Sequence, residues 1–174
     1  TVFKDYYGVR AYLYKEVRMK KCEICGAQIK PKFSLCKDCQ ESKRLPDSLT
    51  IRGSFYQDKQ LKRLKKEVFI DIPERVAKLL QRGEMGMNKL RTFFCMIRNA
   101  HETFSFSEEK NFEDIKPQLW RIITVAEDRK RRKVVPQSFC DFIKLGINIA
   151  LKDSSGRELY GFVEFFRSII AYSK

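Results

Sequence analysis

The sequence predicts a mainly α-helical protein in which a C-terminal five-helix bundle follows a small four-cysteine module and a basic helix. Three observations support this fold class. Apolar residues recur every three or four positions through residues 72–174, as on helices that bury one face. Two Cys-x-x-Cys pairs lie within residues 22–39, and cationic residues crowd residues 56–69. We therefore expect an N-terminal unit at 1–47, a basic linker helix at 48–71 and the bundle at 72–174.

The charge of the chain points to a polyanionic partner. Its 174 residues carry 36 Lys and Arg against 22 Asp and Glu, a net charge of +14. Such an excess favours nucleic acid through counterion release and long-range attraction. An anionic membrane is the second candidate, but no apolar run approaches the roughly 20 residues of a spanning helix. Residues 1–10 mix charged and aromatic side chains, unlike a signal peptide, so we expect a cytoplasmic protein that does not bind a membrane.

The N-terminal segment has the pattern of one amphipathic helix. Its apolar residues at helical spacing are Val2, Tyr6, Val9, Leu13 and Val17. Further along, a polar stretch from Glu41 to Asp47 contains Pro46. This stretch predicts a loop that separates the cysteine module from the following segment.

Four cysteines have the spacing of a metal site. Cys22 and Cys25 form one pair, Cys36 and Cys39 form the other, and ten residues separate the pairs. Four thiolates spaced in this way can converge tetrahedrally on one Zn²⁺, and because they leave no open coordination position we expect a structural metal. Gly26 tolerates the positive φ that a tight turn around the metal needs. The alternative is a pair of disulfides, which a reducing compartment disfavours.

Residues 56–69 predict a strongly basic helix. Leu61, Leu64 and Val68 fall on one helical face, and most other positions are cationic: Lys59, Lys62, Arg63, Lys65 and Lys66. Residues 51–70 contain six basic and two acidic residues, so much of the positive field is concentrated here. This segment is therefore a candidate nucleic-acid contact.

The C-terminal part predicts five helices separated by turn residues. The first begins near Pro73, which suits a first helical turn, and ends at Gly83. The short connections between helices favour antiparallel packing in a compact all-α domain. The other four apolar stripes cover residues 90–104, 115–126, 136–150 and 159–170.

Arginines on the second and third bundle helices are expected to bind phosphate. At about 100° per residue, Arg132 falls about 20° and Arg129 about 80° from Arg121, away from the apolar side of the third helix. Arginine suits phosphate because its planar fork donates two hydrogen bonds at once. The alternative is a solvated charged face. The candidate contacts are Lys89, Arg91, Arg98, Arg121, Arg129, Arg131 and Arg132 in the bundle, and Lys62, Arg63 and Lys66 in the basic segment.

The sequence lacks the patterns that mark an active site. His101 is the only histidine and lies within an apolar helical stripe, which favours a partly buried packing role. We find no glycine-rich phosphate loop, no nucleophile with an obvious base and no carboxylate cluster suited to two-metal chemistry. We therefore expect a protein that is not an enzyme.

Three stretches of the bundle resemble a known family. They are Met87–Phe94 (MNKLRTFF), Asn111–Leu119 (NFEDIKPQL) and Phe162–Tyr172 (FVEFFRSIIAY). They are similar to the small subunit of type III-A CRISPR effector complexes, over about residues 72–174. The resemblance implies a non-catalytic helical subunit of antiviral defence, stacked in several copies beside backbone subunits along guide RNA and target RNA. The cysteine module is an addition to the bundle that this family usually contains.

Two other functions stay open at this point. The chain could be an independent zinc-ribbon regulator, which would bind free DNA or RNA with sequence-dependent affinity. It could also be a zinc-bearing nuclease. A subunit of a multi-copy complex would instead bind tightly only beside its partner subunits.

Overall fold

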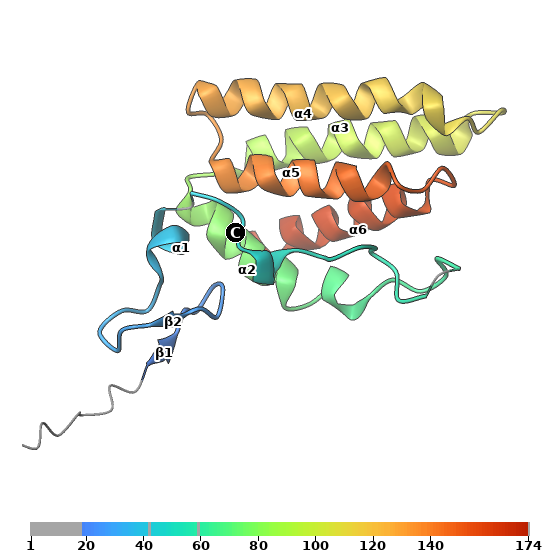
Figure 1. Cartoon of the computed structure of the whole chain (residues 1–174). Helices are drawn as coiled ribbons and strands as arrows, with labels where there is room; N and C mark the ends of the chain where they lie inside the picture. The colour runs from blue at the N-terminus through green and yellow to red at the C-terminus, as the bar shows by residue number, and fades with distance from the viewer. Residues whose placement is uncertain (1–18, 42, 59, 174) are drawn as a thin grey trace, which may run out of the picture.

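The computed structural model describes residues 19–41, 43–58 and 60–173. The helix predicted for residues 2–17 lies outside them. In the described part a small β-hairpin and a short helix stand at one end of a helical bundle (Figure 1), which confirms the mainly α fold class. None of the helices in this part is long and apolar enough to cross a membrane.

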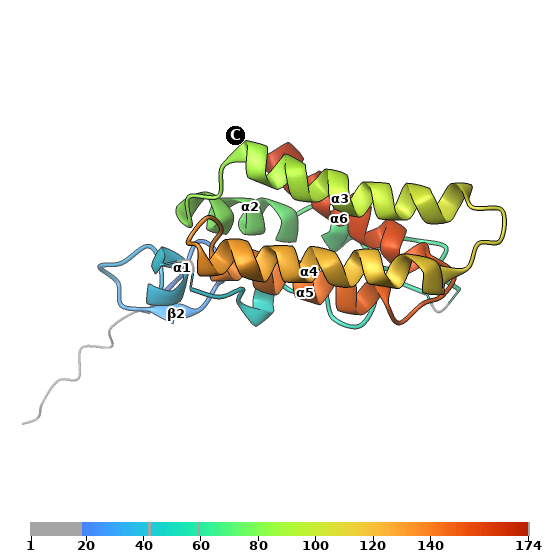
Figure 2. The ribbon, with the colours of Figure 1, turned by 90° about the horizontal axis from the view of Figure 1, so that it is seen from above.

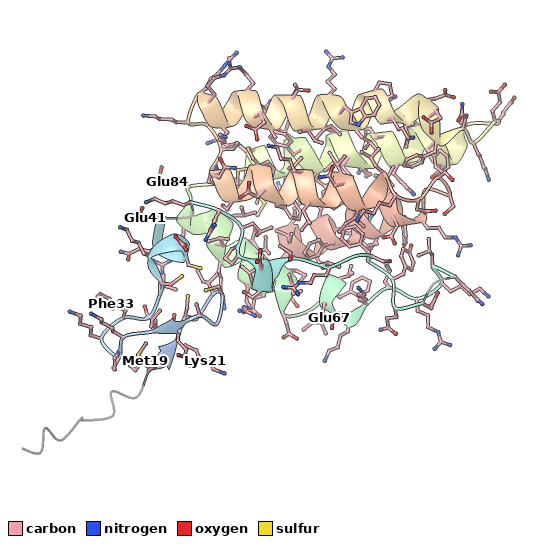
Figure 3. The ribbon with its side chains drawn as sticks, viewed as in Figure 1. Met19, Lys21, Phe33, Glu41, Glu67 and Glu84 are labelled. Carbon is pink, nitrogen blue, oxygen red and sulfur yellow. The ribbon has the colours of Figure 1, made fainter. Side chains whose placement is uncertain are left out.

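The cysteine module consists of two short strands and one short helix. β1 (Lys20–Lys21) pairs antiparallel with β2 (Gln28–Ile29), and Lys20 lies opposite Ile29. A loop then leads to α1 (Lys37–Glu41), in which Cys39 is fully buried. A unit this small rarely folds on a hydrophobic core of its own, so it needs a metal or a neighbour. Figure 3 shows the module's side chains that lie away from the bundle helices, among them Met19, Lys21 and Phe33.

The segment between module and bundle is not the basic helix that the sequence predicts. In its described residues, helical structure is confined to two 3-10 turns, η1 (Asp47–Leu49) and η2 (Lys66–Val68). Between these turns Tyr56 pairs with Leu64 in an antiparallel bridge, so the chain makes a tight hairpin. Lys59 of the predicted helix lies outside the described residues.

Local hydrogen bonds explain why the helix does not form. The carboxylate of Asp58 accepts hydrogen bonds from the backbone N–H groups of Lys62 at 3.0 Å and Arg63 at 3.1 Å. Such side-chain bonds compete with a helical ladder and hold a turn instead. Leu64 is partly buried against the core, and Val68 is fully buried. The apolar spacing that predicted a helix therefore marks the points at which a loop is anchored.

The C-terminal part forms the five predicted bundle helices. α4 packs against α3 and α5, and α6 packs against α2, α3 and α5, as the two perpendicular views show (Figures 1 and 2). A 3-10 turn, η3 (Phe112–Ile115), precedes α4. The helices are α2 (Ile72–Arg82), α3 (Met87–Phe106), α4 (Lys116–Arg131), α5 (Gln137–Ala150) and α6 (Arg157–Tyr172).

Phenylalanine rings fill the centre of the bundle. The ring of Phe142 on α5 lies 5.4 Å from that of Phe162 and 5.1 Å from that of Phe166, both on α6. Gly146 permits this close approach, because a Cβ at that position would lie only 2.0 Å from the Phe162 ring. Aromatic pairs at such distances contribute beyond the area that they bury. The packing of α5 on α6 therefore depends on a small residue facing a large one.

The module, the linker and the bundle share one hydrophobic core. Phe55 of the linker stacks on Phe162, with ring centroids 5.9 Å apart. Glu158 in the first turn of α6 is buried, and its carboxylate accepts a hydrogen bond from the Phe55 N–H at 2.9 Å. The N-terminal segments are thus bound to the last helix of the chain by both apolar and polar contacts.

Candidate cysteine metal centre and nucleic-acid interface

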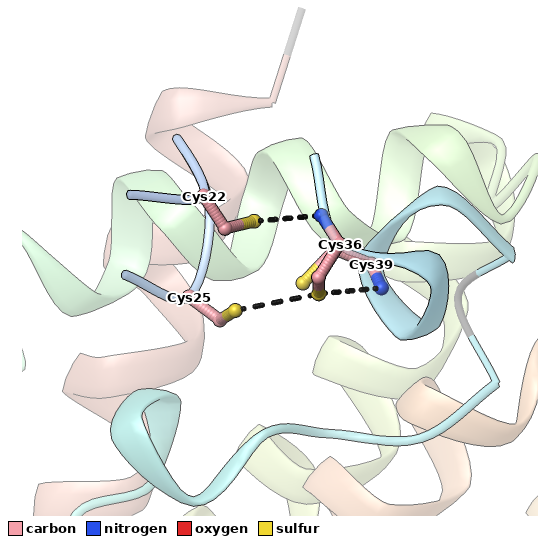
Figure 4. A group of neighbouring side chains, drawn as sticks. All are labelled: Cys22, Cys25, Cys36 and Cys39. Carbon is pink, nitrogen blue, oxygen red and sulfur yellow. Dashed lines mark hydrogen bonds between the residues drawn. The ribbon is translucent and has the colours of Figure 1, made fainter. Parts of the chain in front are cut away.

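The four predicted cysteines come together at one point. Their sulfur atoms all lie within 4.8 Å of one another (Figure 4). Cys22 and Cys25 lie in the turn between β1 and β2, Cys36 directly precedes α1, and Cys39 lies within α1. Gly26 adopts the predicted positive φ of 76° in the first turn. The paired spacing in the sequence therefore identified the cluster correctly.

The geometry of the cluster suits a tetrahedral metal ion. The Sγ atoms of Cys25 and Cys36 are 3.5 Å apart, too far for a disulfide and close to the ~3.8 Å between sulfurs on one tetrahedral Zn²⁺ with bonds of about 2.3 Å. Backbone N–H groups point at the sulfurs, from Cys36 to the Cys22 sulfur at 3.4 Å and from Cys39 to the Cys36 sulfur at 3.4 Å. Such donors stabilise thiolates, and four thiolates could hold one metal ion.

Electrostatics within the cluster also suit a cation. Burial raises the pKa of the Cys22 thiol, but N–H donation from the backbone of Cys25, Cys36 and Ile24 outweighs this and lowers it to about 6. Burial and the neighbouring sulfurs of Cys36 and Cys25 raise the pKa of Cys39. One thiolate therefore opposes the ionisation of the next, and a positive ion between them would favour the ionisation of all four.

Lys89 and Arg129 hold α3 against the end of α4. The Lys89 ammonium donates a hydrogen bond to the Val134 carbonyl at 2.8 Å. The Arg129 guanidinium lies over the Phe93 ring, 5.0 Å from its centroid, and Arg129 is only partly exposed. Arg129 is therefore turned toward the α3–α4 contact, and its predicted place in an outward arginine row is wrong. Its 80° offset from Arg121 brings it to the edge of the buried face.

Three of the other candidate arginines already have acidic partners. Arg131 and Arg132 both contact Asp128, each at 3.0 Å. On α3, Arg98 lies 3.3 Å from the carboxylate of Glu102 one turn further along. The two pairs with Asp128 reduce the positive potential at the end of α4, and the pair with Glu102 reduces it on α3.

Arg91 and Arg121 are exposed on α3 and α4, and neither side chain has an acidic or hydrogen-bonding partner among residues 19–41, 43–58 and 60–173. The side chains of Lys62, Arg63 and Lys66 are also exposed, on the linker hairpin and η2 rather than on a helix. These five are the candidate contacts whose positive charge stays available to a ligand.

Sequence reasoning missed the residues that neutralise the candidate arginines and those that hold the cysteine turn in place. Asp128 stands three and four residues before its partners, a spacing that is visible in the sequence. Arg75 on α2 donates to the carbonyl of Ile24, and Ser48 donates to the carbonyl of Cys25 at 2.7 Å. These two contacts join segments that are distant in the sequence, so no local sequence pattern predicts them.

A known protein family matches the bundle part of the chain and not the cysteine module. The family model described as Csm2 Type III-A matches residues 63–174, which include all five bundle helices and leave out the cysteine module. No curated protein and no solved structure gives a significant match. The matched stretch covers well over half of the chain. The protein therefore belongs to the Csm2 Type III-A family, the small subunits of type III-A CRISPR effector complexes.

Proposed function

We propose that this protein is a non-catalytic small subunit that binds the phosphate backbone of the guide RNA or target RNA in a type III-A effector complex, in the cytoplasm and beside further copies of itself. The observation that carries the proposal is the pair of exposed guanidinium groups without acidic partners, Arg91 and Arg121, on adjoining helices of the family-matched bundle. Contacts of this kind give affinity without base readout.

The expected contribution of each cationic residue to RNA binding depends on whether it already has an acidic partner. Arg91 and Arg121 can meet phosphate without losing an existing partner. Arg131, Arg132 and Arg98 must first leave Asp128 or Glu102, so their net contribution is smaller. Lys62, Arg63 and Lys66 extend the positive surface along the linker. Lys89 and Arg129 stabilise the contact between α3 and α4 and add little direct binding.

The cysteine cluster is proposed to hold one structural Zn²⁺. Cys22, Cys25, Cys36 and Cys39 would supply all four ligands, and a closed tetrahedral site leaves no position for a substrate. The metal would therefore stabilise the fold of the module.

The salt dependence of RNA binding tests the proposal. Using the full chain with its metal, we would measure the affinity for a labelled single-stranded RNA over a range of salt concentrations. Each phosphate contact contributes about 0.7 to the log–log slope, so the double variant Arg91→Ala, Arg121→Ala should reduce the slope by about 1.4. Arg131→Ala with Arg132→Ala should reduce it less, because Asp128 already neutralises part of that charge.

Arg82→Ala is the matched control, since Arg82 is exposed and has no partner within the described ranges but lies on α2. It should leave the slope unchanged. An unchanged slope after loss of both Arg91 and Arg121 would refute the proposed binding surface. Native mass spectrometry of the purified complex should find several copies of the chain together with RNA.

A further inference from the structure

A cleft at one end of the bundle combines aromatic and cationic side chains. The linker hairpin, Phe69 just after η2, the second half of α3 and the first turn of α6 line a volume of about 830 Å³. These segments meet at the end of the bundle where α3 ends and α6 begins (Figure 1). The volume lies within the roughly 300–1,000 Å³ of small-ligand sites. None of the described residues that line it belongs to the candidate phosphate contacts of α3 and α4.

Two aromatic rings lie open to this cleft. Tyr160 on α6 is 41% exposed, and one side of its ring packs on His101 with the centroids 5.5 Å apart. Phe69, directly after η2, is also 41% exposed. Tyr56 lies deeper, where its hydroxyl donates to the Arg157 carbonyl at 3.0 Å. The cleft therefore offers ring surface that the protein's own packing does not cover.

The charged residues of the cleft are all cationic. Lys62, Lys110 and Arg157 line it, and no acidic residue is present among its described lining residues. Lys62 and Lys110 are exposed, and their ammonium groups have no partner in the part of the chain that the structure describes. An anion in the cleft can therefore pair with either ammonium group without displacing an internal ion pair.

The walls of the cleft are held in place before any ligand binds. One guanidinium nitrogen of Arg157 donates to two carbonyls of the hairpin, Gln60 at 3.1 Å and Leu61 at 2.9 Å. The carboxylate of Asp153 accepts from the backbone N–H groups of Arg157 at 3.0 Å and Glu158 at 3.2 Å, which caps the start of α6. A ligand would thus meet a preformed surface and lose little free energy to ordering it.

We propose that this cleft binds one unstacked nucleotide of single-stranded RNA, with its base against Tyr160 and Phe69 and its phosphate near Lys62 and Lys110. An aromatic surface beside cations is the combination that single-stranded nucleic acid requires, because bases stack and phosphates pair with ammonium groups. The inference rests on the proposed RNA-binding function and adds a base-contacting site to it. The same subunit then contacts RNA both through its backbone and through a base.

Abasic RNA separates base binding from backbone binding. We would compare the affinity of the full metal-loaded chain for a short oligouridine and for an oligomer of equal length made of abasic ribose phosphates. Stacking of one base corresponds to about fivefold tighter binding or more, so the oligouridine should bind at least that much more tightly. Tyr160→Ala should reduce oligouridine affinity to the abasic level, whereas Tyr160→Phe should retain it.

Tyr172→Ala is the matched control, because Tyr172 lies on the same helix and is 40% exposed. It should not change either affinity, and Arg121→Ala should weaken both oligomers equally. A second measurement on the unmodified chain, photo-crosslinking with 4-thiouridine RNA, should label the peptide containing Phe69 or Tyr160.

Equal affinity for the two oligomers, or crosslinks confined to other peptides, would overturn the nucleotide site while leaving backbone binding intact. Absence of binding to either oligomer, both by the chain alone and by the chain assembled with its partner subunits, would overturn both proposals. If Tyr160→Ala impairs assembly with other subunits but not oligouridine binding, the cleft is a protein contact and the inference is wrong.

Discussion

The carboxylate of Asp141 on α5 accepts a hydrogen bond from the backbone N–H of Leu45, 3.1 Å away and just after α1. Its other oxygen accepts from the Gln137 side chain at 2.6 Å, which fixes its orientation. Ser48 and Arg75 bind the carbonyls of Cys25 and Ile24 nearby. Because these carbonyls belong to the first cysteine turn, these contacts join the cysteine cluster to the linker and the bundle.

Loss of the metal should therefore weaken the whole chain. We expect elemental analysis to find one zinc ion per chain, and Cys39→Ser to abolish it. The variant should also unfold at least about 2–4 °C lower, which is the shift that a 1 kcal/mol loss produces in a chain of this size. Cys95→Ser, at an exposed cysteine outside the cluster, should change neither value. A bundle that melts at the same temperature without zinc would contradict this coupling.

Removal of the Asp141 carboxylate should detach the module without touching its metal ligands. Asp141→Ala leaves the Leu45 N–H without its partner, which costs about 1–3 kcal/mol for a buried donor. Urea unfolding followed by circular dichroism measures this change in the free energy of unfolding. Glu109→Ala removes an exposed carboxylate that has no partner in the described part of the chain and should have no effect. Equal stability of the two variants would show that the contact is not needed.

The packing of α5 on α6 should be sensitive to one methyl group. In Gly146→Ala the new Cβ would lie 2.0 Å from the Phe162 ring. Overpacking costs about 1–3 kcal/mol and should exceed the ~1 kcal/mol that alanine gains over glycine in a helix. Gly86→Ala adds the same methyl group at the N-cap of α3, where no atom beyond its chain neighbours lies within 4 Å, so it lacks this clash and should cost less. Adding Phe162→Leu to Gly146→Ala should restore part of the lost stability.

Acidic pH should destabilise the protein partly through His101. Burial lowers the pKa of this side chain below its ordinary value of 6.5. The folded protein then binds fewer protons than the unfolded chain, so the contribution of His101 to stability is complete above about pH 6.5 and is lost as the pH falls through the folded-state pKa. His101→Gln should lose less stability than the wild type between about pH 7.5 and pH 5.5. Identical pH profiles from urea unfolding would refute this role.

Much of this architecture could be predicted from local patterns. Apolar periodicity identified all five bundle helices, and the turn residues Pro73 and Gly83 marked the limits of the first. The spacing of Cys22, Cys25, Cys36 and Cys39 identified a cluster whose sulfurs do converge. These features depend on residues close together in the chain, or on a ligand pattern that one metal geometry imposes.

The linker and the charge balance could not be predicted in this way. The spacing of Leu61, Leu64 and Val68 suits a helix and an anchored loop equally well, and the hydrogen bonds of Asp58 decided between them. Similarly, helical azimuths alone could not show that Arg129 packs on Phe93 of another helix.

The sequence by itself therefore determined which segments of the bundle are helical, where the cysteine cluster forms and that the chain carries a strong positive charge. Only the tertiary structure decided which cations stay available, how the module docks through Asp141, and that Tyr160 and Lys62 face one cleft. The physical reason is that periodicity records the environment of each residue along its own helix. Ion pairs, ring contacts and clefts depend on segments that meet only after the chain has folded.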